Sequence, residues 1–210
     1  MDYKFSLGNF KCKVSNMSLL PVIDCPNCTK CQDVCYARHS IKQYPNTFKA
    51  WQHNSFLIRE GKFAELKKDV SVFCHYHNTR YFRFHVGGDI VSVKHFKTIK
   101  EIAVENPNTK FLAFTKSFYF IDTDLPDNLA IICSLMKGMP IPESLDKLPR
   151  AYAGNPADFP NDARAEKAIK CSGKCDRCYK CWFVGKLNFD VIFKIKRVWN
   201  KQEKRQNGCF

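Results

Sequence analysis

Residues 80–92, RYFRFHVGGDIVS, indicate the fold class of this chain of 210 residues. Apolar side chains alternate with polar or amphipathic ones, which is typical of a strand whose two faces lie in different environments. The two faces would consist of Phe82, Phe84 and Val86 on one side and Tyr81, Arg83 and His85 on the other. The Gly-Gly pair that follows predicts a turn at the end of this strand.

Strand and helix patterns alternate over most of the chain. Strands are predicted in residues 109–117 (TKFLAFTKS), 127–138 (DNLAIICSLMKG) and 149–155 (PRAYAGN). Helices are predicted in residues 46–73, with a break at Gly61, and in residues 93–106. Strands separated by helices at this pitch predict an α/β fold, either a partial (βα) barrel or a parallel sheet with helices.

Two domains are expected from the distribution of these patterns. Residues 1–160 would form the α/β partial-barrel domain with an N-terminal cysteine loop. Residues 161–210 would form a small cysteine-rich metal module that ends in a basic helix. The tail, residues 186–206, has apolar residues near helical spacing and seven Lys/Arg against two acids. It is predicted to be an amphipathic helix with a cationic face, or a helix docked on the core with a solvated charged side.

Polar residues and glycines follow each predicted strand. In a parallel sheet the carboxyl ends of the strands meet at one edge, where sites are usually built. The residues at these ends are Gly87, Gly88, Asp89, Thr115, Lys116, Ser117, Ser134, Tyr152 and Ala153. The sequence therefore predicts a functional site on this edge.

Two groups of four cysteines are the strongest chemical signal. The first has C-x2-C-x2-C-x3-C spacing and the second has C-x3-C-x2-C-x2-C spacing; they are Cys25, Cys28, Cys31 and Cys35, and Cys171, Cys175, Cys178 and Cys181. The first spacing matches a bacterial ferredoxin run, which favours one or two 4Fe–4S clusters. Zinc is the alternative metal, with Cys25/Cys28 and Cys178/Cys181 as candidate halves of one site.

The composition of the chain predicts its cellular location and the class of its binding partner. No apolar run approaches 20 residues and the N-terminus is interrupted by charges, so we expect no membrane span, no export and a cytoplasmic location. In a reducing compartment clustered cysteines indicate metal rather than disulfides. The net charge of +14 favours a polyanion such as DNA or RNA, although a generally basic protein is an alternative.

Two histidine-containing features leave alternatives open. His85 is either a site residue or a core histidine, because it lies on the strand face opposite Phe84. Cys74, His75 and His77 form a Cys-His-x-His pattern that is a weak indication of metal binding.

The segments CPNCTKCQDVCYA, FRFHVGGDI, FLAFTKS and CDRCYKCW, in this order, resemble the bacteriophage family called gene product 88. The layout is also similar to radical S-adenosylmethionine (SAM) enzymes, in which a cysteine loop follows the first strand of a partial barrel. This resemblance implies that Cys25, Cys31 and Cys35 hold a cluster with one open iron. It also implies that Gly87, Gly88 and Asp89 contact the SAM amino group and that Thr115, Lys116 and Ser117 line the same rim.

One departure from that pattern concerns spacing. Radical SAM proteins usually carry C-x3-C-x2-C near the start, whereas here this spacing occurs at Cys171, Cys175 and Cys178. Too few residues follow it to build a barrel, so the late match is a coincidence or an auxiliary cluster.

Three functions are compatible with these features. The first is an iron–sulfur enzyme that cleaves SAM, with a reductant such as a flavodoxin, and modifies a nucleic acid or nucleotide. In it Arg83, His85 and Lys116 would position the substrate or the SAM carboxylate, with Asp89 at the same catalytic rim. The second is a nucleic-acid-binding protein whose metal is structural. The third and weakest is a redox carrier between two clusters.

Overall fold

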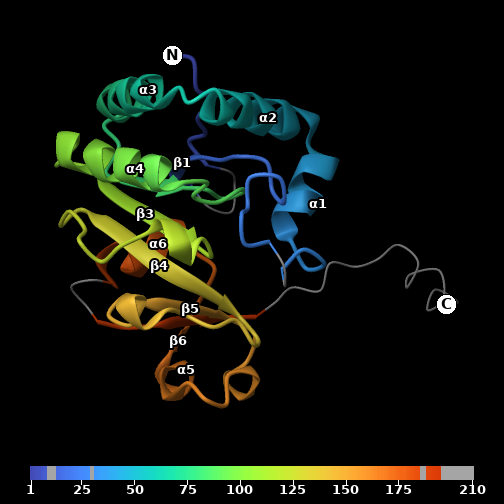
Figure 1. Cartoon of the computed structure of the whole chain (residues 1–210). Coiled ribbons are helices and arrows are strands. Elements are labelled where there is room, and N and C mark those ends of the chain that lie inside the picture. The colour runs from blue at the N-terminus through green and yellow to red at the C-terminus, as the bar shows by residue number, and fades with distance from the viewer. Residues whose placement is uncertain (9–12, 29–30, 185–187, 195–210) are drawn as a thin grey trace, which may run out of the picture.

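A computed structural model describes residues 1–8, 13–28, 31–184 and 188–194. Within these residues seven strands form one sheet in the order β1-β2-β3-β4-β5-β7-β6, and every neighbouring pair is parallel (Figure 1). The predicted α/β class, a parallel sheet with helices, is confirmed. From β1 to β5 the strand order follows the chain, so each connection steps to the adjacent strand.

The bounds of the elements are as follows. The strands are β1 (Ser15–Met17), β2 (Tyr81–Phe84), β3 (Lys110–Thr115), β4 (Leu129–Met136), β5 (Arg150–Ala153), β6 (Ile169–Lys170) and β7 (Val191–Phe193). The α-helices are α1 (Tyr36–Gln43), α2 (Pro45–Arg59), α3 (Phe63–Tyr76), α4 (Val93–Glu105), α5 (Ala163–Lys167) and α6 (Cys175–Cys178). Short 3-10 helices are η1 (Phe118–Phe120), η2 (Glu143–Leu145), η3 (Pro156–Asp158) and η4 (Lys180–Phe183).

The expected break in the first long helix occurs at Gly61. This residue has φ +71°, in the left-handed region that glycine tolerates best, and it separates α2 from α3. The helix predicted for the tail is wrong at Val191–Phe193, which forms β7 between β5 and β6. Val191 and Ile192 are buried there, so pairing with two strands prevails over helical spacing. Residues 186–187 and 195–206 of that predicted helix lie outside the described part of the chain.

Helices α2, α3 and α4 cover one face of the sheet. Phe82 and Phe84 of β2 and Phe111 of β3 are fully buried on this face and form an aromatic row with ring centroids 5.0 to 5.8 Å apart. The helices contribute the other half of this core, with the following buried residues: Ile58, Leu66, Val70, Phe73, Phe96, Ile99 and Ile102. The predicted alternation is confirmed within β2, because Phe82 and Phe84 pack here while Tyr81 faces the other side. It is wrong at His85, whose φ of +61° departs from strand geometry and whose ring lies beside His95 of α4.

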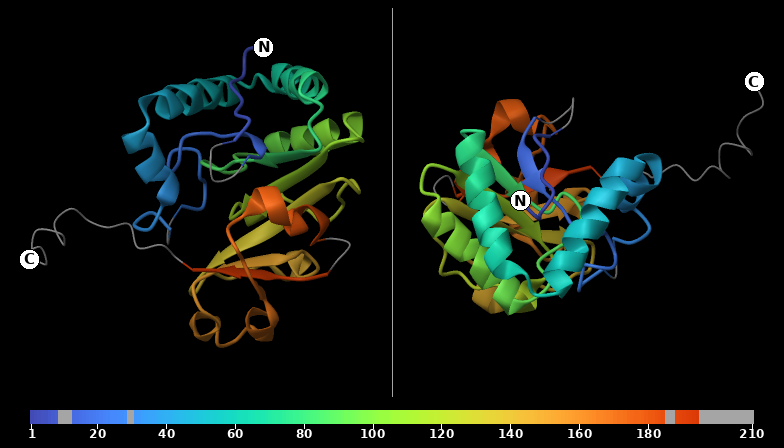
Figure 2. Two further views of the ribbon diagram at one scale, coloured as in Figure 1. Left: turned by 180° about the vertical axis from the view of Figure 1, so that it is seen from behind. Right: turned by 90° about the horizontal axis from the view of Figure 1, so that it is seen from above.

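The C-terminal segment covers the opposite face of the sheet. Trp182 is buried against this face, and its indole Nε1 donates a hydrogen bond of 3.0 Å to the carbonyl of Phe82. Tyr179 stacks on Tyr81 with ring centroids 4.2 Å apart. The segment with α6 lies across the strands in the view from behind (Figure 2, left). The division expected near residue 160 therefore separates two stretches of sequence that share one sheet.

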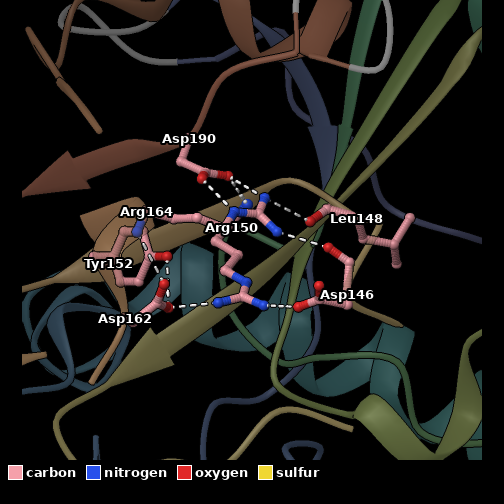
Figure 3. A network of polar contacts seen from close by, with 7 residues as sticks. All are labelled: Asp146, Leu148, Arg150, Tyr152, Asp162, Arg164 and Asp190. Atoms are coloured by element: carbon pink, nitrogen blue, oxygen red, sulfur yellow. Dashed lines mark hydrogen bonds and ion pairs between the residues drawn. The ribbon is translucent and has the colours of Figure 1, made fainter. Parts of the chain in front are cut away.

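A network of ion pairs joins β7 to β5 at the amino ends of these strands (Figure 3). The Arg164 guanidinium donates two hydrogen bonds of 2.7 Å to the Asp190 carboxylate, which also accepts 2.7 Å from the backbone N–H of Arg150. The Arg150 guanidinium pairs with Asp146 and Asp162. The Asp190 side chain is only 9% exposed, so its charge depends on these partners.

We expect Asp190→Asn to destabilise the protein, because it removes the charge that balances Arg164 and part of the acceptor for Arg150. The free energy of unfolding should fall by about 2 to 4 kcal/mol, or about 5 to 12 °C in Tm. Urea denaturation and calorimetry measure both. Asp127→Asn, at an exposed carboxylate, is the control and should stay within about 0.5 kcal/mol of wild type. Equal stability of the two variants would contradict the stabilising role given to the ion pairs of Asp190.

Candidate functional site

The first cysteine loop begins directly after β1 and lies at the carboxyl ends of β1 and β2, where it runs beside α1 (Figure 1). Three hydrogen bonds tie this segment to the residues after β2. The N–H of Leu19 donates 2.9 Å to the carbonyl of Gly87, and the Ser18 hydroxyl accepts 3.1 Å from the N–H of Val86. The hydroxyl of Tyr36 donates 2.7 Å to the carbonyl of Val86. The thiols are therefore held over the strand ends.

Asp89 connects the ends of β2 and β3 with the cysteine loop. Its carboxylate accepts hydrogen bonds from the Thr115 hydroxyl (2.6 Å) and from the N–H groups of Lys116 (2.8 Å) and Ile90 (2.7 Å). Its own N–H donates 2.7 Å to the carbonyl of Asp24. Burial raises the pKa of the Asp89 carboxyl, and its hydrogen-bond donors oppose part of that rise. Three donors already engage this carboxylate, so the predicted SAM contact by Asp89 stays a prediction.

Two residues inside the loop complete this attachment, and the sequence analysis missed both. The Asp24 carboxylate accepts 2.7 and 3.1 Å from the Arg59 guanidinium and 3.1 Å from the N–H of Leu20. The Asn27 side chain donates 2.9 Å to the carbonyl of Lys116. The sequence offered one indication of these contacts, namely that Asp24 precedes Cys25 and Asn27 precedes Cys28. Short polar side chains in loops commonly form hydrogen bonds with backbone groups.

The Gly-Gly pair after β2 is explained by close packing. A Cβ on Gly87 would come within 2.3 Å of the Trp51 ring, and one on Gly88 within 2.5 Å of the Leu19 side chain. Gly88 also has φ +76°, which favours glycine. These contacts press α2 and the loop after β1 against the strand end. A cosubstrate contact by either glycine stays a prediction.

The four thiols of the first group influence one another. Burial, together with smaller contributions from the charges of Asp89, Cys28 and Cys31, raises the pKa of Cys25 to about 12. Burial raises the pKa of Cys28 to about 11 together with Cys31 and Cys35, whereas the positive charge of Lys116 lowers it. A bound metal cation would lower the pKa values of these thiols instead, because metal ligation requires thiolates.

Lys116 and Ser117 bring polar atoms to the same rim. The Lys116 ammonium donates 3.1 Å to the hydroxyl of Ser134 at β4. The N–H of Ser117 donates 2.9 Å to the Thr115 hydroxyl, but the Ser117 hydroxyl is buried and has no hydrogen-bond partner among the described residues. An unpaired buried hydroxyl is costly and commonly marks a place for a water or ligand.

The second cysteine group lies on the sheet face opposite the helices. Cys171 follows β6, two of its members begin and end α6, and Cys181 lies in η4. Burial, with smaller contributions from Cys171, Cys175 and Cys178, raises the pKa of Cys181 to about 12, while the charge of Arg83 opposes part of this rise. The Arg83 guanidinium lies 5.0 Å from the Phe114 ring centroid, and its buried Nε has no hydrogen-bond partner in the described ranges.

Arg83 is thus placed beside the second group, although the sequence analysis expected it at the first site with Lys116. Its catalytic role stays a prediction. Each cysteine group has a cation whose charge acts on a thiol: Lys116 on Cys28 in the first group and Arg83 on Cys181 in the second. A cluster or zinc ion bound by four thiolates is anionic, so a neighbouring cation is the complement that such a site needs.

The described thiols of each group lie near one another but do not have the geometry of a metal site. No group of three or more His, Cys, Asp or Glu side chains has the arrangement of a metal site in the part of the chain that the structure describes. The Sγ atoms of Cys28 and Cys31 lie 3.8 Å apart. Two thiolates on one tetrahedral zinc ion stand about 3.8 Å apart, given Zn–S bonds of about 2.3 Å. The prediction that these groups bind metal therefore rests on the number and position of their cysteine thiols.

His85 lies in the interior and forms a pair with His95 of α4. Their ring centroids are 5.0 Å apart, and His85 has φ +61°, which is unusual for a residue with a side chain. Neither ring nitrogen of His85, nor Nε2 of His95, has a hydrogen-bond partner among the residues described. Burial lowers the pKa of His85 well below its usual value, helped by His95 and Arg83, and lowers that of His95 to about 3. His85 is therefore a buried histidine without polar partners, and its catalytic role stays a prediction.

We predict that these two histidines make the protein acid-sensitive. Because their folded-state pKa values lie below 6.5, the unfolded chain binds more protons, and stability falls as the pH drops from 6.5 towards 3. Each histidine contributes about 1.4 kcal/mol per pH unit to this slope.

Urea denaturation at several pH values measures this slope. His95→Asn should reduce it by about one histidine's share, and His75→Asn, at an exposed histidine, is the control. A His95→Asn slope equal to that of wild type between pH 6 and 4 would refute the prediction.

No helix in the described ranges combines the length and apolar character that a membrane span requires. No curated protein and no solved structure matches the chain. The sequence model of the family described as gene product 88 matches residues 4–184, which include β1 to β6, both cysteine groups and the rim residues. The family resemblance noted in the sequence is thereby confirmed, and the chain belongs to the gene product 88 family.

Proposed function

We propose that this protein is an iron–sulfur enzyme of the radical SAM type that acts on a nucleic acid or nucleotide. The observation that carries the proposal is the position of the first cysteine group. It follows β1 and is tied over the carboxyl ends of β2 and β3 by Asp89, Asp24 and Asn27. Catalytic groups of parallel α/β folds belong at this edge of the sheet.

The residues present fit an iron–sulfur cluster. Three thiols of one short loop, Cys25, Cys31 and Cys35, would hold the cluster and leave one iron open for SAM, and the spacing of the whole group matches a ferredoxin run. Lys116 supplies a positive charge beside Cys28, which supports an anionic cluster. When bound, such a cluster would supply the electron that cleaves SAM reductively, with an external reductant such as a flavodoxin replacing that electron.

The chain's own rim residues would bind and orient the cosubstrate. The Lys116 ammonium can pair with a carboxylate, and the unpaired Ser117 hydroxyl can donate a hydrogen bond to the same ligand. Asp89 would act through the backbone of Lys116, which it holds at 2.8 Å, as a positioning residue. Trp51, packed on Gly87, would keep water away from the loop's inner side.

A second candidate is a metal-stabilised nucleic-acid-binding protein without catalysis. The 3.8 Å separation of the Cys28 and Cys31 sulfur atoms favours it, because this is the spacing of two ligands on one zinc ion. In that case the metal would fix the loop on the strand ends, and the basic surface would bind phosphates.

Metal and sulfide analysis of the anaerobically purified chain separates the two candidates. We expect about four irons with matching acid-labile sulfide if one group holds a cubane, and about eight if both do. Cys25→Ala, Cys31→Ala and Cys35→Ala should each lower the iron content by one cluster. Cys133→Ala, at a buried thiol of β4, is the control and should keep it.

Activity provides the second readout. With a strong reductant and SAM, the wild-type protein should release 5′-deoxyadenosine, and the three cysteine variants should not. Lys116→Gln should keep its iron but weaken SAM binding by roughly 10-fold, as expected for a lost charge-assisted hydrogen bond. Zinc without sulfide, or iron without SAM cleavage, would overturn the enzyme proposal.

A further inference from the structure

A large cavity lies away from the first cysteine loop, at the carboxyl ends of β5, β6 and β7. Its volume is about 1040 Å³, and Gly154, Lys170 and Phe193 mark the ends of the three strands on its wall. Residues 171–174, 176 and 177, from the segment of the second cysteine group, form another wall. Because all strands are parallel, this cavity opens on the same edge of the sheet as the first cysteine loop.

The described lining of this cavity is strongly cationic. It contains one carboxylate, Asp176, and five positive side chains: Lys13, Lys170, Lys174, Arg177 and Lys194. All five are exposed, and none of them takes part in an ion pair among the described residues. The described cations that do pair with acids, such as Lys67 with Glu101 and Glu105, lie outside this lining. The cavity is therefore a site for an anion with several charges.

Apolar surface accompanies these charges. Phe193 is partly exposed and Pro156 is exposed, and both line the cavity together with Ile192. Cations interleaved with an aromatic ring are the combination that binds single strands, because phosphates pair with the charges and bases stack on the ring. A free inorganic anion would leave the apolar surface without a partner.

The size of the cavity favours a single strand over a duplex. A volume of about 1040 Å³ accommodates a few nucleotides, whereas a duplex needs a long open face. Three strand steps separate β3 from β7, which is about 15 Å at 4.8 Å per strand. A short oligonucleotide in the cavity could therefore extend along the rim to Lys116 and the first cysteine loop.

We propose that this cavity binds the phosphodiester backbone of a single-stranded nucleic acid, with Phe193 as a stacking surface for a base. The inference rests on the proposed function in that it names the substrate class and the place where the substrate is held. Binding in the cavity can be measured without a reductant or turnover. Failure of the enzyme proposal would therefore leave the binding proposal standing, and the reverse also holds.

Fluorescence anisotropy with a labelled ten-nucleotide oligothymidylate tests the proposal on the full-length, anaerobically purified protein. The pocket variant Lys170→Gln/Lys174→Gln/Arg177→Gln should bind roughly 10- to 100-fold more weakly at 100 mM salt, and its salt slope should fall by about 2. The control variant Lys68→Gln/Lys97→Gln/Lys147→Gln removes three exposed charges elsewhere and should bind within about threefold of wild type.

A second substitution distinguishes a nucleic acid from a simple polyanion. Phe193→Leu should keep apolar packing but remove the stacking ring, so it should weaken oligothymidylate roughly 5-fold or more. The same variant should leave the competition by inorganic polyphosphate unchanged. A duplex of the same length should compete poorly with the single strand.

Several outcomes would overturn the proposal. Equal losses in the pocket and control variants would indicate general charge attraction. Wild-type affinity of the pocket variant would exclude the cavity, and a preference for polyphosphate or duplex would exclude a single-stranded ligand. Circular dichroism and Tm of each variant check that the fold is kept, and oligothymidylate binding that survives the loss of iron would still support this site.

Discussion

The buried carboxylate of Asp89 is the interaction on which the site depends. It accepts hydrogen bonds from the Thr115 hydroxyl and the Lys116 N–H at the end of β3, and the Asp89 N–H donates to the carbonyl of Asp24 in the cysteine loop. Burying a carboxylate is costly unless donors surround it, and here three donors do so. One side chain thus fixes β2, β3 and the thiol loop relative to one another.

The two cysteine groups occupy different parts of this framework. The first lies over the strand ends beside Lys116, and the second lies under the sheet beside Arg83. Trp182 and Tyr179 attach the second group to the sheet through Phe82 and Tyr81. If its thiols bind metal as proposed, a C-terminal segment that closes the open sheet face would link folding to metal binding, because its helices are short.

Much of the sheet could be predicted from the sequence. The strands around Phe82, Phe111 and Ile131 carry long apolar or alternating patterns, so their positions and the polar strand ends were evident. Strands β1, β6 and β7 have two or three residues each, and their pairing depends on neighbours distant in the chain. The spacing of the cysteines indicated metal, but the attachment of the loop by Asp24 and Asn27 is tertiary. Arg83 was placed on the correct strand face, although its neighbour Cys181 comes about a hundred residues later.

The electron paramagnetic resonance spectrum of the reduced protein, recorded with and without SAM, tests the central claim most directly. The claim is that the thiol loop on the strand ends holds a cluster whose environment includes the cosubstrate site formed by Lys116 and Ser117. The account predicts an iron–sulfur signal that changes on addition of SAM, and this SAM-responsive signal should be absent from Cys25→Ala. A protein without an iron–sulfur signal, or a signal that SAM leaves unchanged, would contradict it.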